Sequence, residues 1–331
     1  LHPKINIWPY SLKYKMGKPT MRLNPKVEST RNRTLLEKAL PILVTYAFLL
    51  PKAPRKGRGR PAFDYRSILV LSIIRIMLKK TYADYDTFLR TDWRLKEMLN
   101  LKNLPCKSTL NNYDIRYFTM HLLVSLNHKL LKDWLKKPTD FLLDASGIRI
   151  NGRSVWYSIR TKRQIRKKEC DKVHIAVTDC YLLIANFRIT SRKRNDSPFL
   201  RSLLKAFNDI GLVIADKGYS SKTNALFVIK KGGAFFSPFK SNHTPKGFNG
   251  WAWLSQMWKA FEVASRSIYN KRNRVEAVFS ALKRRYGDHL GGTKWFTRRR
   301  EMALRFIAYN LRVIVAIQIS REKEVPFWVR A

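Results

Sequence analysis

The sequence predicts an α/β domain, with a mixed sheet flanked by helices, that follows an all-helical N-terminal domain. Up to about residue 137, apolar residues recur at helical spacing, and short connections separate these stretches. From about residue 138, short runs rich in valine, isoleucine and aromatic residues alternate with helical stretches, which is the pattern of an α/β layer. The chain has 331 residues, 45% of them hydrophobic, and this length suggests two domains or one large domain with an arm.

The N-terminal part divides into a basic arm and a helical module. Residues 1–57 hold the arm, a first helix at 35–50 and a linker rich in proline, glycine, lysine and arginine. Residues 58–137 are predicted to form a helical module of helix-turn-helix size, a size that is common among modules that bind DNA. Ser108 is expected to cap its last helix, because a hydroxyl can accept a bond from a free amide of the first turn. The helices predicted in the module are 65–80, 83–100 and 108–136.

Residues 138–320 are predicted to form the α/β domain, with a small insertion at about 238–262 and a C-terminal tail at 321–331. The first strand lies in FLLDASGIRI. VHIAVTD and YLLIANFRIT follow with almost nothing between them, which predicts a hairpin. Two later apolar runs, GLVIAD and GAFFSPF, are predicted as further strands. The helices predicted in this domain are 197–210, 267–287 and 296–318.

The net charge points to a polyanionic partner. The chain carries 66 Lys and Arg against 23 Asp and Glu, a formal charge of +43, and both halves are basic. Nucleic acid is the first candidate partner and an anionic membrane surface the second. A disordered basic tail is excluded, because 12% of the residues are aromatic. Three cysteines make no disulfide framework. No continuous apolar run reaches the roughly 20 residues of a membrane span, so no membrane is expected.

Two acidic residues stand at the ends of predicted strands. Asp144 follows the apolar triplet Phe141–Leu143, and Asp216 follows Leu212–Ala215. A carboxylate at the end of a buried strand is costly unless it is paired, hydrogen-bonded or bound to a metal. Ligand sites in α/β sheets gather at strand carboxyl ends, so the two acids predict one shared site. The alternative is that each acid caps a turn, as Asp often does before glycine.

A third acid belongs to a four-residue helical pattern. Tyr269, Arg272, Glu276 and Lys283 have the spacing Y-x2-R-x3-E-x6-K, which places all four on one narrow stripe of a helix that includes Tyr269. A neighbouring apolar stripe suits packing on the sheet. The alternative is a solvated charged face with an i,i+4 Arg–Glu pair. The apolar stripe consists of Val275, Phe279 and Leu282.

These segments resemble, in order, those of the DDE transposases of bacterial and archaeal insertion sequences, in the group with a Y-R-E-K signature. DASGIRI resembles the first-Asp strand, IADKGYSS the second-Asp motif and YNKRNRVEAVFSALK the signature. KVHIAV, ITSRKRNDSPFL and FIAYNLRVI resemble further catalytic-domain segments, and GRPAFDYRSILVLSIIRIM and PCKSTLNNY the N-terminal module. The resemblance covers about residues 58–318. This chain has DAS where many relatives have DST, and Asn195 where a His often precedes the Asp.

The resemblance implies a ribonuclease-H-like fold and a catalytic, metal-binding trio of Asp144, Asp216 and Glu276. Mg²⁺ or Mn²⁺ is the implied cofactor, with two ions expected, because a pair about 4 Å apart can clamp the attacking and leaving oxygens of a phosphodiester transfer. Water would cleave at a transposon end, and the freed 3′-hydroxyl would attack target DNA. Tyr269, Arg272 and Lys283 would hold phosphates beside the scissile bond.

The implied partner is double-stranded DNA, both the terminal inverted repeats and the target. A homodimer on DNA is expected because two ends must be held together. The implied location is the cytoplasm of a prokaryotic cell, in association with the chromosome.

Two basic stretches add candidate DNA contacts. Arg58 and Arg60, in RGRP, resemble a minor-groove AT hook, although a similar start is common in this transposase module. Arg163, Arg166 and Lys167 lie in a basic loop predicted to follow a DNA backbone, with a solvated loop as the alternative.

Three other functions stay open at this point. A ribonuclease-H-like nuclease without strand transfer would have similar acids, but would leave the Tyr269–Lys283 stripe without a role. A non-catalytic DNA-binding protein would explain the charge but not the ordered acids. A decayed transposase is the third, and the intact trio argues mildly against it.

Overall fold

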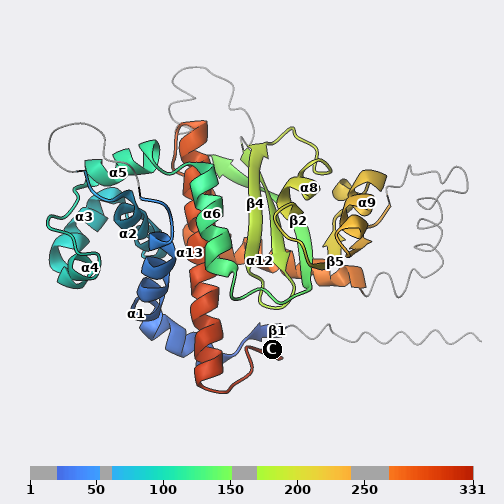
Figure 1. The fold of residues 1–331 in the computed structure, drawn as a ribbon, viewed down its shortest axis with the longest axis horizontal. Coiled ribbons are helices and arrows are strands. Elements are labelled where there is room, and N and C mark those ends of the chain that lie inside the picture. The colour runs from blue at the N-terminus through green and yellow to red at the C-terminus, as the bar shows by residue number, and fades with distance from the viewer. Residues whose placement is uncertain (1–20, 53–61, 151–169, 240–267, 331) are drawn as a thin grey trace, which may run out of the picture.

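The structure is a computed structural model, and it describes residues 21–52, 62–150, 170–239 and 268–330. Figure 1 shows a helical part and a sheet on opposite sides of one long helix, α13 (Trp295–Glu322). The predicted fold class is confirmed: a mixed sheet is flanked by helices and preceded by a helical N-terminal part.

Six described helices make up the N-terminal part. Five of them begin at a side chain that accepts a hydrogen bond from a free backbone N–H of the first turn; these residues are Asn24, Asp64, Thr81, Asp92 and Thr119. The helices are α1 (Pro25–Phe48), α2 (Tyr65–Met77), α3 (Tyr82–Thr91), α4 (Trp93–Met98), α5 (Lys107–Arg116) and α6 (Met120–Leu131).

Several predicted helix boundaries were wrong, and caps explain most of the differences. The stretch 108–136 forms two helices, because Thr119 caps α6 within it. The stretch 83–100 is divided in the same way at Asp92. Ser108 lies inside α5, whose N-cap is Cys106 and has no side-chain capping bond. The first helix begins at Pro25 instead of residue 35, because Asn24 caps it and proline fits the first helical turn.

The sheet has the strand order β4-β3-β2-β5-β6, and a short strand, β7 (His289–Leu290), pairs with the end of β2. β3 runs antiparallel to β2 and β4, whereas β5 and β6 run parallel to β2. β2 lies between β3 and β5, so the residues at the end of β2 come close to those at the end of β5. The strands are β2 (Thr139–Ile150), β3 (Cys170–Thr178), β4 (Ile184–Ser191), β5 (Ile210–Ala215) and β6 (Ala234–Phe236).

Helices cover both faces of the sheet. On one face lie α8 (Phe199–Leu204) and α9 (Lys222–Lys230), with a small apolar cluster beneath them. On the other face lie α12 (Asn273–Tyr286) and α13, within a larger cluster that continues into the N-terminal helices. The predicted helix 197–210 is shorter in the structure, because the Asp209 carbonyl already accepts a bond from Thr139 N at 3.0 Å, where β5 approaches β2.

Helix α13 holds the two parts together. It packs against α1, α2 and α6 on one side and against α12 and β4 on the other. Asn310, fully buried on α13, accepts a bond from Ile184 N at 2.8 Å and donates to Asn127 Oδ1 at 2.8 Å. By length and composition α13 could cross a membrane, but 89% of its most apolar window is buried inside the fold, as expected of a core helix.

The ends of the described chain meet in a small sheet of their own. β1 (Met21–Leu23) pairs antiparallel with β8 (Trp328–Arg330), with Met21 opposite Arg330. The arm and the tail, which carry no strand in the sequence prediction, therefore form an ordered contact in the part that the structure describes.

Candidate active site

Asp144 and Asp216 lie on neighbouring parallel strands and face the same way. Leu143 of β2 is paired with Ala215 of β5, so the two acids follow matched positions. Side chains alternate between the faces of a strand, and Leu142, two residues before Asp144, belongs to the cluster on the α12 and α13 side. Both acids are therefore directed toward the face that α12 covers, as the sequence predicted for a shared site.

Glu276 comes to this place on α12. The helix is seated on the sheet by its apolar stripe, in which Val275, Phe279 and Leu282 are buried. A 3-10 turn, η2 (Asn270–Arg272), precedes α12. Tyr269, directly before that turn, has helical backbone conformation. The stripe is thus a helical stretch with one tighter turn, instead of the single regular helix over 267–287 that the sequence predicted.

The four stripe residues line up beside the two strand acids. Arg272 donates from Nη1 to Asp144 Oδ2 at 3.0 Å and from Nη2 to Glu276 Oε1 at 3.3 Å. Tyr269 Oη donates to Asp216 Oδ1 at 3.2 Å. Lys283 Nζ donates to Ser146 Oγ at 3.1 Å, two residues beyond Asp144 on β2. The structure therefore brings the three predicted acids, Tyr269 and Arg272 into one connected group, and it places Lys283 against β2 close to Asp144.

Burial and charge act in opposite directions on the first acid. Burial raises the pKa of Asp144 and outweighs the Arg272 guanidinium, which acts to lower it; the nearby charge of Asp216 adds to the rise. Burial also raises the pKa of Tyr269, with the Asp216 charge adding to the rise. For Arg272, burial alone would lower the pKa, but attraction to Asp144 prevails and the pKa is raised. Arg272 is therefore held as a cation against the acids.

The donor set suits a hard divalent cation. Carboxylate oxygens are the ligands that Mg²⁺ and Mn²⁺ prefer. Within the described residues no three His, Cys, Asp or Glu side chains are gathered closely enough to hold an ion. The Arg272 guanidinium instead joins Asp144 to Glu276, so a protein cation takes oxygens that a metal would need. The donor types of the site therefore suit a metal, and in this structure Arg272 holds two of the three acids.

Asp179 is a site residue that the sequence analysis missed. It lies in the turn between β3 and β4 and forms ion pairs with Lys271, at 3.5 Å, and with Arg274. Both partners flank Arg272, so the β3–β4 turn fixes the start of α12 over the sheet. The available signal was weak: an acid in a turn and an excess of cations between residues 271 and 274.

A buried polar group lies behind the two strand acids. His174 of β3 is fully buried, with Nδ1 3.0 Å from Tyr219 Oη and Nε2 3.1 Å from Thr190 Oγ1. Tyr219 belongs to the short turn that follows Asp216. His174 is thus a packed histidine, and it supports the chain segment that carries the second acid.

Five predicted DNA contacts lie outside the described residues, together with nearly all of the predicted insertion at 238–262. They are Arg58, Arg60, Arg163, Arg166 and Lys167.

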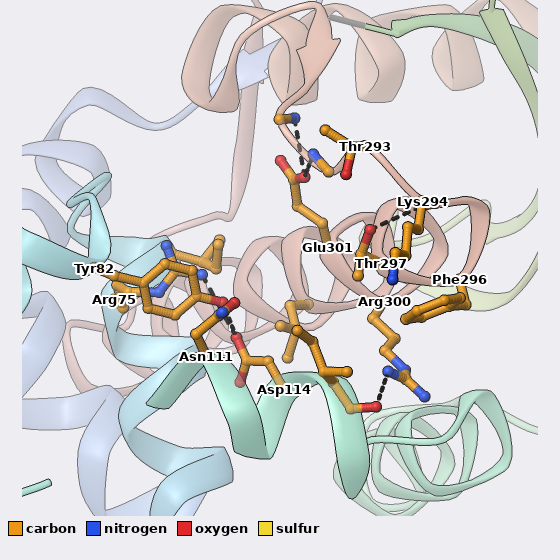
Figure 2. Close-up of a pocket in the computed structure, with 15 residues that line it drawn as sticks. Arg75, Tyr82, Asn111, Asp114, Thr293, Lys294, Phe296, Thr297, Arg300 and Glu301 are labelled. Atoms are coloured by element: carbon orange, nitrogen blue, oxygen red, sulfur yellow. Dashed lines mark hydrogen bonds and ion pairs between the residues drawn. The ribbon is translucent and has the colours of Figure 1, made fainter. Parts of the chain in front are cut away.

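A separate pocket of about 510 Å³ lies between the N-terminal helices and the start of α13 (Figure 2). Asp114 lies at its wall and accepts bonds from Ser72 Oγ, at 2.6 Å, and from Tyr82 Oη. Glu301 accepts bonds from the backbone N–H groups of Gly291 and Gly292. None of the three predicted catalytic acids lines this pocket, so it is distinct from the candidate active site.

The family described as Transposase DDE domain matches residues 135–311, a range that contains all three acids. Among solved structures, the chain is similar to the cryo-EM structure of a piggyBac transposase synaptic complex with hairpin DNA. The identity is 9%, the TM-score is 0.44, and the match covers 91% of this chain and 76% of the other. A likeness of that size supports no functional conclusion. No curated protein matches the chain.

Proposed function

Because this chain belongs to the family of transposases with a DDE domain, we propose that it is the transposase of an insertion sequence, which cleaves DNA at transposon ends and joins them to a target. The chain is an enzyme of the polynucleotidyl transferase and endonuclease class. The observation that supports the proposal is the connected group of Asp144, Asp216 and Glu276 with the signature residues of α12 and the turn before it.

Asp144, Asp216 and Glu276 are the residues that would hold divalent metal, with two Mg²⁺ or Mn²⁺ ions as the proposed set. Such ions, when bound, supply positive charge to the attacking and leaving oxygens of a phosphodiester. The chain itself places the three carboxylates on the face of the sheet that α12 covers. It also places the cationic side chains of Arg272 and Lys283 along the adjacent helical stretch.

Arg272, Lys283 and Tyr269 are the proposed phosphate contacts. A guanidinium can bind a phosphate through two parallel hydrogen bonds, whereas a lysine ammonium acts as a point charge. All three side chains lie along one line beside the acids, so a DNA strand that follows α12 would pass each in turn. Hydrolysis at the transposon end leaves a 3′-hydroxyl, and that hydroxyl then displaces the 3′-oxygen at a target phosphate. No covalent bond between protein and DNA is needed.

We further propose that the protein acts as a homodimer on the terminal inverted repeats, on the chromosome in the cytoplasm of a prokaryotic cell. A dimer is the simplest assembly that holds two ends together during transfer.

The central test is Asp216→Asn, measured in a cleavage assay on duplex DNA with Mg²⁺. Loss of one carboxylate removes several kcal/mol of charge stabilisation, so cleavage should fall by about 100-fold or more while DNA binding persists. Asp209→Asn is the matched control, because this exposed acid lies at the opposite end of the same strand region and should leave cleavage unchanged. Retained Mg²⁺-dependent cleavage by Asp216→Asn would overturn the assignment.

Strand transfer needs its own assay, with pre-cleaved transposon ends and a supercoiled target. The proposal expects joined products that require both divalent metal and a free 3′-hydroxyl. Cleavage without any joining would identify a ribonuclease-H-like nuclease that lacks strand transfer.

A further inference from the structure

Arg272 occupies the carboxylates that the reaction requires. One guanidinium engages Asp144 Oδ2 at 3.0 Å and Glu276 Oε1 at 3.3 Å, so the first and third acids of the proposed trio share one protein cation. The remaining acid, Asp216, accepts a bond from Tyr269. Each of the three acids is therefore engaged by a signature residue.

We propose that Arg272 keeps divalent metal out of the site until a DNA phosphate draws its guanidinium away, so that metal binding depends on DNA. This inference rests on the proposed function, since it takes the three acids as metal ligands and the signature residues as phosphate contacts. It goes further in assigning Arg272 two successive partners, the carboxylates first and the phosphate second.

The burial of the pair gives this arrangement its strength. The Asp144 side chain is 15% exposed and that of Arg272 is 17% exposed, so water screens their attraction poorly. Glu276 is 58% exposed and adds less. A metal ion that entered without displacing Arg272 would place two cations on one desolvated carboxylate, which like-charge repulsion opposes.

Arg272 also has spare capacity for a second partner. Its Nε is buried and has no hydrogen-bond partner among the described residues. A buried donor without a partner is costly, and a phosphate oxygen would relieve that cost. A phosphate has the geometry to accept two donors of one guanidinium, so it can compete with the single bond that Arg272 makes to each carboxylate.

Charge balance points the same way. Two divalent ions would bring four positive charges to three carboxylates, two of which already pair with Arg272. Entry of a DNA strand adds negative phosphates along the same line and restores the balance. Metal and DNA should therefore bind with positive coupling, and by linkage each should raise the affinity of the other.

The test is a titration with Mn²⁺ alone, followed by electron paramagnetic resonance of the free ion, for the full chain with and without short duplex DNA at low salt. For the wild type, DNA should tighten Mn²⁺ binding by about 10-fold or more. Arg272→Ala should bind Mn²⁺ about 10-fold more tightly than the wild type without DNA, and added DNA should change that affinity little. Arg284→Ala removes one positive charge from an exposed position of α12 and should behave as the wild type.

Two further variants keep the outcomes separate. Arg272→Lys retains the charge but loses the fork that joins two carboxylates, so it should lie between the wild type and Arg272→Ala. Asp216→Asn reports on the metal site itself. If DNA-bound wild type takes up Mn²⁺ and Asp216→Asn does not, but Arg272→Ala matches the wild type without DNA, this inference fails while the proposed function stands. If neither the wild type nor any variant binds Mn²⁺ even with DNA, both fail. Thermal unfolding of each variant confirms that it is folded.

Discussion

At the scale of single residues, His174 makes the fold sensitive to acid. Burial lowers the pKa of His174 to about 4; the Asp196 carboxylate, 3.5 Å away, opposes this shift, and Lys172 adds to it. The unfolded chain has an ordinary histidine pKa of about 6.5, so the unfolded state takes up the proton first. The stabilisation from a neutral His174 is therefore complete above about pH 6.5 and is lost as the pH falls toward 4.

A pKa difference of this size corresponds to about 3 kcal/mol of unfolding free energy. Chemical denaturation at several pH values between 7 and 4 should show this loss in the wild type and a shallower loss in His174→Gln, which cannot take up a proton. Other acids titrate in both proteins, so the difference between the two curves is the quantity to read. Parallel curves would contradict the prediction.

The meeting of the three acids in one place was predictable, but their contacts were not. Strand ends predicted that Asp144 and Asp216 share a site, the resemblance added Glu276 from the helical stripe, and the catalytic role of all three stays a prediction. The same spacing put Arg272 on their side of the helix, yet nothing in the sequence tells whether a cation on that stripe faces solvent, phosphate or carboxylate. That choice depends on the distance between α12 and β2, which the apolar packing of the whole face sets.

At the scale of elements, Asn310 joins three of them. Its side chain accepts from Ile184 N and donates to Ile184 O and to Asn127 Oδ1, so α13 and α6 are both tied to the start of β4. Asn310→Leu keeps the side-chain volume but removes the Asn310 partner of Ile184 N and of Asn127 Oδ1, whereas Ile184 O keeps its bond from Asn127 Nδ2. We expect a loss of about 2 to 4 kcal/mol in the free energy of unfolding, because each orphaned buried group costs about 1 to 3 kcal/mol.

Equilibrium unfolding in urea measures this loss, and a variant of unchanged stability would contradict it. Gln318→Leu is the matched control, since it makes the same kind of change at a partly exposed position of α13 and should stay within about 0.5 kcal/mol of the wild type.

Element boundaries were harder to predict than element types. Thr119 and Asp92 were visible capping residues, and weighing them would have divided both long predicted helices correctly. Asn24 followed by Pro25 was an equally clear start signal for α1, although the charged residues after it suggested an arm. The short strands β7 and β1 carried no local signal, because partners far along the chain define them.

At the scale of the whole molecule, α13 could not have been recognised as the common core of both parts. Its pattern predicted a helix, but only its contacts with α1, α2 and α6 on one side and α12 on the other show that it joins them. The length of the sequence allowed two domains or one large domain with an arm, and the apolar cluster runs without a break from the N-terminal helices to one face of the sheet. Movement of one part against the other would therefore disturb packed apolar surface.

The charge of the whole chain sets the last prediction. The formal charge is +43, and the chain belongs to a family of enzymes that act on DNA. DNA is therefore the expected polyanionic partner of that charge. If binding depends mainly on phosphate contacts, each contact releases counterions, and affinity falls steeply with salt. With about 6 to 10 contacts, affinity for duplex DNA should drop about 10³-fold or more between 50 and 200 mM salt. Fluorescence anisotropy with a labelled duplex gives the slope of log affinity against log salt.

Asp216→Asn should shift this line only slightly, since it changes one charge in an excess of 43. A slope near zero would mean that the charge serves another partner.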